Sequence, residues 1–314
     1  MIKNLNKLII TGNLGFIFSH VTDYFISKGW YVYGIDNHST GSHPYLIEDW
    51  EKTGLYTHIQ MDVSDEKIID TIIKIEPTYI IHAAANSDVD ESILSPLFVV
   101  RQNTLGNLYI FEAARKCSNL KKLVYANTDE IFGECRTQKK EDEILFPRNP
   151  YSASKATGAL FRYAYDNSYP FLTDKTAETR FCNVFGPRQD PRKIIPRIIQ
   201  SLVTGEAVPV HNKGVGKREY IYVKNIPSVI EKVLLNGNRS YNITNNDLFS
   251  VNEIIEIIEK ITGKIVPKCD GIRPGMDSIY QMDSLRIKLD LGWKLEYTFE
   301  EGIKELLKTN NLCQ

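Results

Sequence analysis

The chain has 314 residues and a formal net charge of −1, so charge gives no reason to expect a nucleic acid or an anionic membrane surface as partner. No apolar run is long enough to span a bilayer, and the N-terminus reads as a first strand rather than a signal peptide. Five scattered cysteines without a Cys-x-x-Cys pair favour a reducing, cytoplasmic compartment, and no metal site is expected.

The first predicted element is a buried parallel strand from Lys7 to Thr11, and a glycine turn follows it directly. Gly12 and Gly15 match the first two positions of a Gly-x-x-Gly-x-x-Gly turn, in which backbone N–H groups at a helix start face a dinucleotide pyrophosphate. Phe18 occupies the third position, where glycine normally permits close packing of the helix on the strand. We therefore expect local overpacking or a shifted first helix.

The second predicted strand, Tyr31 to Ile35, ends at Asp36. A carboxylate at this place can accept hydrogen bonds from the adenosine ribose hydroxyls and would repel a ribose phosphate. Residues 37–41 contain no arginine that could bind such a phosphate. Both observations favour NAD over NADP.

Two further strands are predicted before the middle of the chain, at Ile59–Val63 and at Tyr79–Ile81. The second leads into small residues, Ala83 to Ala85, which would let the chain pass close under a dinucleotide. His82 lies at this strand end, and we interpret it as a core histidine rather than a catalytic one.

The stretch from Tyr125 to Lys155 carries the candidate chemistry. An apolar strand, Leu123 to Tyr125, runs into Thr128, Asp129 and Glu130, which places a hydroxyl and two carboxyls where ligands bind in open α/β sheets. Further on, Tyr151 and Lys155 stand at i and i+4, hence on one face of a helix. A lysine ammonium beside a phenol favours the phenolate, so we expect the tyrosine to act as a base.

With this order of motifs, the chain resembles the extended branch of the short-chain dehydrogenase/reductases over nearly its whole length. Within that branch it is most similar to the nucleotide-sugar 4,6-dehydratases, in which Thr-Asp-Glu sits at this strand end. The resemblance implies NAD as cofactor and places Phe181 near the nicotinamide. It also implies the following cofactor-binding residues: Gly12, Gly15, Phe16, Ile17, Asp36, Asn37, Asp62, Val63, Ala84, Ala85, Thr104, Tyr151 and Lys155.

The expected fold is α/β, a Rossmann-type, mainly parallel, doubly wound sheet with a smaller C-terminal substrate lobe. We assign residues 1–186 to the NAD-binding domain, with a late strand returning near 220–245, and most of 187–314 to the substrate lobe. Two arginines are expected in loops, and the planar guanidinium group of arginine can donate two parallel hydrogen bonds to a phosphate. The resemblance places them on the substrate diphosphate, and its implied substrate-binding residues are Ser87, Thr128, Asn183, Arg218 and Arg273.

The resemblance also implies a homodimer, because the family pairs two helices from each subunit. The corresponding helices here are expected at Leu97–Arg115 and Tyr151–Tyr165. Their apolar stripes could equally be buried within one subunit.

The expected activity is NAD-dependent dehydration of a nucleotide-diphosphate sugar to its 4-keto-6-deoxy form. Tyr151, Lys155 and Thr128 would serve oxidation at C4, after which Glu130 would remove the C5 proton and Asp129 would protonate the departing 6-hydroxyl. Two adjacent carboxyls in different protonation states suit such an elimination. The alternatives are a nucleotide-sugar 4-epimerase of the same family, which oxidises C4 without eliminating, or a catalytically silent nucleotide-sugar or NAD-binding protein.

Overall fold

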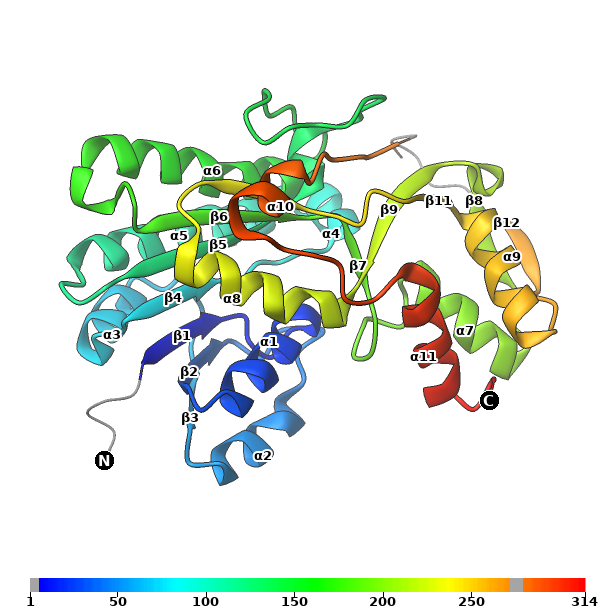
Figure 1. Ribbon diagram of the computed structural model, residues 1–314, viewed down its shortest axis with the longest axis horizontal. Coiled ribbons are helices and arrows are strands. Elements are labelled where there is room, and N and C mark those ends of the chain that lie inside the picture. The colour runs from blue at the N-terminus through cyan, green and yellow to red at the C-terminus, as the bar shows by residue number, and fades with distance from the viewer. Residues whose placement is uncertain (1–5, 272–278, 314) are drawn as a thin grey trace.

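The computed structural model describes residues 6–271 and 279–313 and is built on a seven-stranded, fully parallel sheet (Figure 1). Its strand order is β10-β6-β5-β4-β1-β2-β3, so the predicted Rossmann-type α/β architecture is confirmed. The strands are β1 (Lys7–Thr11), β2 (Tyr31–Asp36), β3 (Tyr56–Gln60), β4 (Tyr79–His82), β5 (Lys122–Thr128), β6 (Thr176–Phe181) and β10 (Ser240–Ile243).

One predicted strand was placed too late in the chain. The expected Ile59–Val63 strand begins at Tyr56 and ends at Gln60, so Asp62 and Val63 follow the strand rather than forming its end. The reason is register: β3 pairs with Val32–Asp36 of β2 and stops where that neighbour stops.

Helices cover both faces of the sheet, as a doubly wound fold requires. On one face α1 packs beside α8, and on the other α5 packs against α3, α4 and α6. Apolar residues at helical spacing fix these contacts, as in α3, where Ile68, Ile69 and Ile72 are buried. The helices are α1 (Phe16–Ser27), α2 (Ile47–Lys52), α3 (Lys67–Ile75), α4 (Val89–Leu94), α5 (Pro96–Lys116), α6 (Pro150–Ser168) and α8 (Ile226–Asn236).

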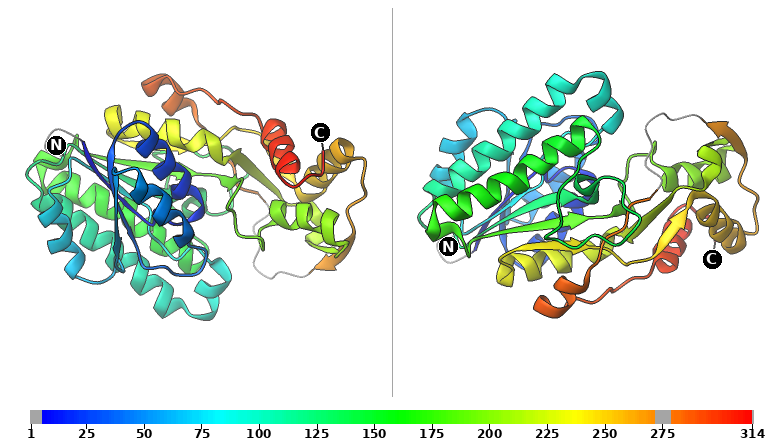
Figure 2. Two further views of the ribbon diagram at one scale, coloured as in Figure 1. Left: turned by 90° about the horizontal axis from the view of Figure 1, so that it is seen from below. Right: turned by 90° about the horizontal axis from the view of Figure 1, so that it is seen from above.

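A smaller lobe lies beyond the carboxyl ends of the sheet strands (Figure 2). It contains a three-stranded sheet, β11-β9-β7, and a two-stranded sheet, β12-β8. The chain crosses back to the large sheet for α8 and β10 before it completes the lobe, so our division at residue 186 remains a proposal. The other elements are β7 (Asn183–Phe185), α7 (Ile194–Thr204), β8 (Val208–His211), β9 (Lys217–Tyr222), β11 (Leu248–Ser250), α9 (Val251–Thr262), β12 (Lys268–Gly271), α10 (Leu285–Leu291) and α11 (Phe299–Thr309).

A buried ion pair on β6 ties several of these parts together. The guanidinium of Arg180 donates to both carboxylate oxygens of Glu178, at 2.8 and 3.0 Å, and both side chains have no exposed surface. Glu178 also accepts from Ser240 on β10 (2.7 Å) and from Asn127 on β5 (2.6 Å), while Arg180 donates to the Glu141 carbonyl (2.8 Å). Burial alone would raise the pKa of Glu178, but the Arg180 charge and these donors lower it to about 2.

The connection between the Thr-Asp-Glu turn and α6, residues 133–149, is bound to a segment near the C-terminus. Cys135 donates its backbone N–H to the Ile279 carbonyl and Lys139 donates to Gln281, both at 3.1 Å. Asp283 returns a backbone hydrogen bond to the Lys139 carbonyl (2.9 Å). The connection that follows the Thr-Asp-Glu turn is thus held by a segment far away in sequence.

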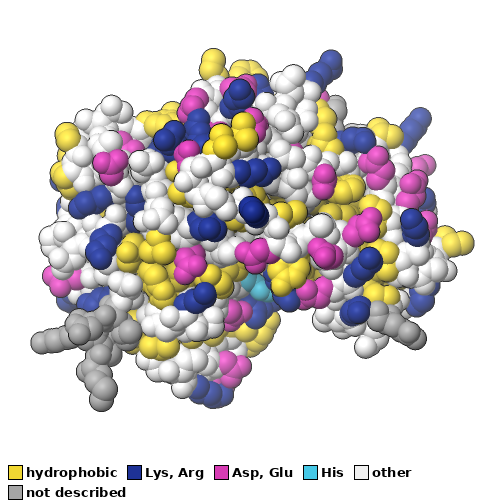
Figure 3. Space-filling view, viewed as in Figure 1, with side chains coloured by type: hydrophobic (Ala, Val, Ile, Leu, Met, Phe, Trp, Pro, Cys, Tyr) yellow, Lys and Arg dark blue, Asp and Glu magenta, His cyan; other side chains and the backbone are white. Residues whose placement is uncertain are grey.

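The face shown in Figure 3 carries charged side chains of both signs, with apolar side chains between them. Among the described residues, no helix combines the length and the apolar character that crossing a bilayer requires. The cytoplasmic location stays a prediction.

We predict that Gly158→Ala lowers the free energy of unfolding by about 1–3 kcal/mol, as overpacking does. A Cβ at Gly158 would lie 2.2 Å from Cζ of Tyr125, whose hydroxyl is fixed by a 2.9 Å bond to the Lys155 carbonyl. Helix propensity alone would make the alanine variant more stable by about 1 kcal/mol. A lower free energy of unfolding in urea therefore identifies the clash with Tyr125 as the cause. In a Tyr125→Leu background the same change should cost less. An equal cost in both backgrounds would contradict this account.

Candidate active site

The glycine turn brings two predicted cofactor segments into contact. Gly12 has φ of +69°, and a Cβ there would lie 2.7 Å from the backbone of Ala84 after β4. The Thr11 hydroxyl fixes this approach, because it accepts the N–H groups of Ala83 and Ala84 at 3.2 Å each. Gly15 stands at the N-cap of α1, so the helix start lies at the carboxyl edge of the sheet, where dinucleotides bind in such folds. Phe16 and Ile17, half-buried, form the first turn of this helix.

Phe18 is accommodated in the core, with 6% of its surface exposed. Its ring meets Phe181 of β6 edge to face, with 6.5 Å between the ring centroids. Phe181 is the residue that we expected near the nicotinamide. The departure from the glycine pattern therefore adds an aromatic contact to Phe181, and α1 still begins at Phe16.

Asp36 is buried at the end of β2 and joins the glycine turn to the loop that follows β2. One carboxylate oxygen accepts the N–H of Leu14 (3.2 Å), and the other accepts the N–H of His38 and the hydroxyl of Ser42, both at 2.9 Å. The carboxylate therefore sits beside the start of α1, as the NAD prediction requires.

Asn37 and Asp62, two predicted cofactor residues from different loops, are hydrogen-bonded to each other at 2.9 Å. Burial would raise the pKa of Asp62, but hydrogen bonds from Ser64, Asn37 and Gln102 lower it overall. Val63 is buried beside Gly106 of α5, where a Cβ would lie 2.7 Å from the valine side chain.

Two buried polar atoms at this edge have no partner among the described residues: the Thr104 hydroxyl and Oδ1 of Asn13 in the glycine turn. Buried polar atoms are normally satisfied, so both are available to a bound group. Together with the close approach of Gly12 to the backbone of Ala83 and Ala84, they fit a dinucleotide at this edge of the sheet.

The Thr-Asp-Glu turn forms a single 3-10 turn at the end of β5. Asn127 starts it by accepting the N–H of Thr128 (3.0 Å). The Thr128 hydroxyl then donates to Asp129 (3.1 Å) and accepts the N–H of Glu130 (3.3 Å), and Asn149, at the N-cap of α6, donates to the Glu130 carboxylate (3.0 Å).

The two carboxyls differ in environment. Asp129 is 5% exposed, and its Oδ2 has no partner among the described residues. Burial and the neighbouring charge of Glu130 raise the pKa of Asp129 to about 7. Glu130 is only half-buried, and its carboxylate accepts from Asn149 at the N-cap of α6. Near neutral pH, Asp129 can therefore hold a proton beside a second carboxyl that is closer to solvent.

Tyr151 and Lys155 are both buried on α6, but the lysine does not act on the tyrosine as the sequence suggested. Burial and the charges of Glu130 and Asp129 raise the pKa of Tyr151 well above its usual range, opposed by a hydrogen bond with Thr128. The Lys155 ammonium donates instead to the Ala126 carbonyl (2.7 Å) and lies 4.5 Å from the centroid of the Tyr125 ring. Burial lowers the pKa of Lys155 to about 7.

Two of the predicted substrate residues, Asn183 and Arg218, lie on strands of the smaller lobe. Asn183 donates to the Glu219 carbonyl (3.3 Å), and Ser87 is exposed in the loop after β4. Arg218 was expected in a loop but lies on β9, because β9 pairs with both β7 and β11. Its guanidinium stands 4.5 Å from the centroid of the Tyr280 ring. Arg273 lies outside the described residues.

Sequence reasoning missed Glu219, the neighbour of Arg218. Its side chain is fully buried and accepts the N–H of Met282 (3.0 Å), and burial raises the pKa of Glu219 to about 8. The sequence around Glu219 does not indicate this burial, because the burial follows from the pairing of β9 with its neighbouring strands in the lobe. The role of Asn149 at Glu130 was also missed, although the sequence Asn149-Pro150 is a recognisable helix start.

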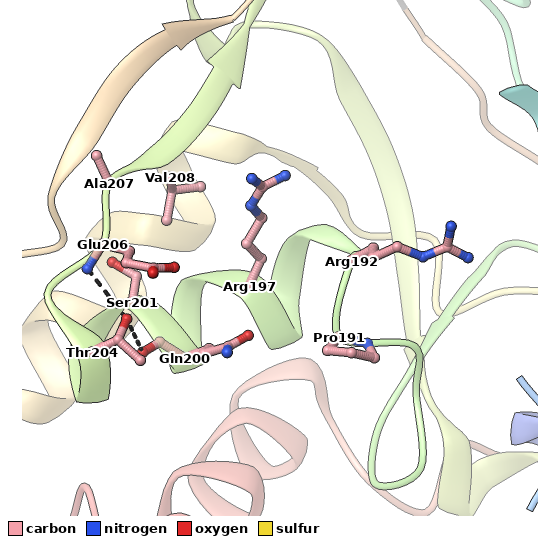
Figure 4. A pocket seen from close by; sticks show the side chains of 9 residues that line it. All are labelled: Pro191, Arg192, Arg197, Gln200, Ser201, Thr204, Glu206, Ala207 and Val208. Atoms are coloured by element: carbon pink, nitrogen blue, oxygen red, sulfur yellow. Dashed lines mark hydrogen bonds between the residues drawn. The ribbon is translucent and has the colours of Figure 1, made fainter.

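A cavity of about 310 Å³ lies in the lobe between α7 and the start of β8 (Figure 4). Its lining includes Arg197, Ser201 and Val208. None of the predicted site residues that the structure describes lines this cavity, so we treat it as separate from the candidate active site.

We predict that Asp36→Ala weakens NAD binding and narrows the difference between the affinities for NAD and NADP. The change removes both the acceptor for ribose hydroxyls and the charge that would repel a phosphate. Calorimetric titration with each cofactor measures the ratio of the NAD and NADP affinities. Asp70→Ala, on the exposed side of α3, serves as the matched control. Equal affinities of the unchanged protein for the two cofactors would contradict the assignment.

Comparison with known proteins agrees with this geometry. The family model described as GDP-mannose 4,6 dehydratase matches residues 9–306. A relative from Haloferax volcanii, the low-salt glycan biosynthesis protein Agl12, is 31% identical over 95% of this chain and 96% of its own.

Two solved structures have closely similar folds. The dTDP-glucose 4,6-dehydratase of Bacillus anthracis, solved with NAD, superposes with a TM-score of 0.89 at 25% identity, covering 97% of this chain and 96% of its own. The UDP-glucose 4-epimerase of Thermotoga maritima, solved with UDP-glucose, gives 0.88 at 26% identity, covering 97% of this chain and 99% of its own. The resemblance found in the sequence is thus confirmed, and the chain belongs to the GDP-mannose 4,6-dehydratase family within the extended short-chain dehydrogenase/reductases.

Proposed function

We propose that this protein is an NAD-dependent lyase that converts a nucleotide-diphosphate sugar to its 4-keto-6-deoxy form. The observation that carries the proposal is the pair of adjacent carboxyls at the end of β5. Asp129 is buried, has a pKa of about 7 and keeps one oxygen free of partners among the described residues, while Glu130 is closer to solvent. An elimination of water needs one acid and one base at neighbouring carbons, and this pair supplies both.

The first step would be oxidation at C4 of the sugar. NAD, when bound, accepts the hydride from C4 and later returns it to C6. Thr128 would hold the 4-oxygen, and Tyr151 would take the hydroxyl proton. Because the pKa of Tyr151 is raised in the structure, the positive nicotinamide and a charged Lys155 would have to favour its phenolate.

The second step would be loss of water across C5 and C6. The C4 ketone acidifies the C5 proton, which Glu130 would remove. The electron pair then expels the 6-oxygen, which would leave as water with the proton of Asp129. Return of the C5 proton from Glu130, with hydride supplied at C6, would give the 4-keto-6-deoxy product. The proton that Tyr151 took balances the one that Asp129 lost.

Cofactor and substrate would meet at the carboxyl edge of the sheet. The glycine turn, Asp36, the Asn37–Asp62 contact and Thr104 would hold NAD, and Lys155 its ribose. Arg218 and Asn183 would bind the substrate diphosphate, with Ser87 near the sugar and Arg273 as a second phosphate contact. Neither the nucleotide base nor the sugar substituents are assigned.

The second candidate is a nucleotide-sugar 4-epimerase, favoured by the structural similarity to UDP-glucose 4-epimerase. An epimerase needs Tyr151, Lys155 and the cofactor, but it needs neither an acid nor a base at C5 and C6. The carboxyl pair therefore favours the dehydratase. A catalytically silent NAD-binding protein would be the third reading, and turnover of any nucleotide sugar would exclude it.

We predict that Glu130→Gln and Asp129→Asn each slow water loss by about 10²–10⁴-fold, the usual contribution of a general acid or base. Hydride transfer at C4 should survive, so the absorbance of reduced cofactor should persist or accumulate during turnover. Mass spectrometry of the sugar product measures the loss of water. Tyr151→Phe is the control, because it should suppress both signals.

The rate of water loss should also depend on pH. Water loss requires protonated Asp129, so its rate should be retained below the raised pKa and fall as pH increases through about 7. Asp129→Asn should remove this decline. Native rates in both carboxyl variants would refute the dehydratase, and inversion at C4 without loss of mass would establish the epimerase.

We further propose a homodimer formed through α5 and α6, which pack side by side on one face of the sheet. Apolar side chains remain exposed on these helices, including Leu97 (87% exposed), Phe98 (52%) and Leu160 (57%). Covering them with the same helices of a second copy would give a symmetric interface.

We predict that Leu160→Glu converts the dimer to a monomer in light scattering, because the change introduces a charge at the centre of the proposed interface. Leu289→Glu should leave the mass unchanged, since Leu289 is 74% exposed on α10, away from both helices. A native protein that is already monomeric at all concentrations would contradict the proposal.

A further inference from the structure

A row of polar side chains crosses three neighbouring strands of the large sheet at their carboxyl ends. The strand pairing sets Thr11 of β1 beside His82 of β4, and His82 beside Tyr125 of β5. Paired residues of neighbouring strands point to the same face of a sheet, so the three side chains lie in one row. All three are buried. The row begins at the residue before Gly12 and ends next to α6, where the Tyr125 hydroxyl donates to a backbone carbonyl (2.9 Å).

His82 is the middle of a hydrogen-bonded chain that leads from the glycine turn to α6. Its Nδ1 contacts the Thr11 hydroxyl (2.8 Å), and its Nε2 contacts the side-chain oxygen of Asn107 on α5 (3.1 Å). The Asn107 amide nitrogen donates to the Ser154 carbonyl (3.2 Å) and to the Thr157 hydroxyl (3.0 Å), both on α6. Three side chains thus connect β1 to the helix that carries the tyrosine and the lysine proposed for catalysis.

The direction of each bond in this chain follows from its Asn107 end. A carbonyl oxygen only accepts, so the part of the Asn107 amide that faces the Ser154 carbonyl must be its NH2 group, and the amide oxygen faces His82. That oxygen also only accepts, hence Nε2 of His82 carries a proton. In a neutral imidazole Nδ1 is then the acceptor, and it receives the proton of the Thr11 hydroxyl.

The other protonation forms of His82 leave groups unsatisfied. With the Asn107 amide turned over and the proton on Nδ1, two carbonyl oxygens would face each other at about 3.2 Å, and the Thr11 hydroxyl proton would have no acceptor among the described residues. A doubly protonated ring would leave the same hydroxyl proton unpaired and would bury a second cation near Lys155. Burial and the Lys155 charge lower the pKa of His82 to about 3, in agreement with a neutral ring.

Both ends of the chain contact parts of the molecule proposed to hold the cofactor. At one end, the Thr11 hydroxyl accepts two N–H groups (3.2 Å each) from the segment that lies against Gly12. At the other end, the Ser154 carbonyl belongs to the residue directly before Lys155. The imidazole therefore lies between the turn proposed for the pyrophosphate and the lysine proposed for the ribose.

We propose that His82 is a positioning residue that fixes Lys155 at a set distance from the glycine turn, so that one NAD molecule can contact both. This inference rests on the proposed cofactor roles of the turn and of Lys155. Because His82 is buried, it acts through Thr11 and Asn107 and not by contact with the cofactor or the reacting atoms.

The test compares the affinities for two ligands, NAD and ADP, by calorimetry on the whole protein. NAD would reach from the turn to Lys155, whereas ADP has only the adenosine and the diphosphate and would reach the turn alone. Asn107→Leu keeps a similar side-chain volume but breaks the chain at its α6 end. NAD affinity should fall about tenfold or more, as expected for a weakened hydrogen bond from a charged group, while ADP affinity should stay unchanged. Loss of support for the turn itself would weaken both ligands equally.

A double substitution distinguishes one connected chain from two local contacts. Thr11 and Asn107 bind opposite nitrogens of the imidazole, so independent effects on the ratio of NAD to ADP affinity would add. In a connected chain, Thr11→Val already breaks the link, and adding Asn107→Leu should not lower the ratio further. Asn167→Leu is the matched control, because it removes an exposed amide bond to the Tyr163 carbonyl (2.7 Å) on α6 and should keep both affinities.

Three results would overturn the inference and leave the cofactor assignment intact. They are an unchanged NAD affinity in Asn107→Leu, equal losses of NAD and ADP affinity in that variant, and additive losses in the double variant. Failure of the unchanged protein to bind either ligand would instead refute the cofactor role on which the inference rests.

A second measurement uses the unchanged protein without ligand, so it does not depend on the folding of any variant. Nitrogen chemical shifts should show the His82 proton on Nε2 and an unprotonated Nδ1, with no change between pH 5 and 9. A proton on Nδ1, or a ring that titrates within this range, would contradict the proposed chain of donors and overturn the inference.

Discussion

The buried ion pair of Glu178 and Arg180 is the interaction on which the arrangement of the site depends. Removing one partner of such a pair leaves an uncompensated charge and costs about 3–5 kcal/mol. Here the loss would also free Asn127, which begins the Thr-Asp-Glu turn, and Ser240, which joins the last strand to the sheet. The Thr-Asp-Glu turn, the sheet edge and the connection at Glu141 are therefore held by one ion pair within β6.

Burial shifts all three of the buried side chains proposed for catalysis in one direction, toward their neutral forms. It raises the pKa of Asp129 and Tyr151 and lowers that of Lys155, so each group is shifted toward its neutral form. Because burial destabilises the charged forms of these side chains, their protonation will depend on the charges of the ligands that bind beside them. A dinucleotide and a nucleotide-diphosphate sugar both do so, which suits chemistry that begins only when both are bound.

The sequence allowed prediction of elements whose signals are local: the strand and turn at Gly12 and Gly15, the acid at Asp36, and the carboxyls at the end of β5. It did not predict contacts that depend on how strands are paired. His58 meets His38 only because β3 lies beside β2 in one register, and Arg218 lies on a strand because β9 has neighbours on both sides. The orientation of Lys155 toward Ala126 likewise follows from packing of α6 on β5, which no spacing in the sequence encodes.

The hydrogen bonds between residues 135–139 and 279–283 have a consequence for the order in which the molecule can assemble. The segment joining the carboxyls to Tyr151 gains its backbone partners from the last part of the chain. During synthesis, the glycine turn and both motifs proposed for catalysis emerge before those partners do. The nucleotide-binding half can thus begin to pack early, whereas the backbone hydrogen bonds to the connection between β5 and α6 form only after residues 279–283 have left the ribosome.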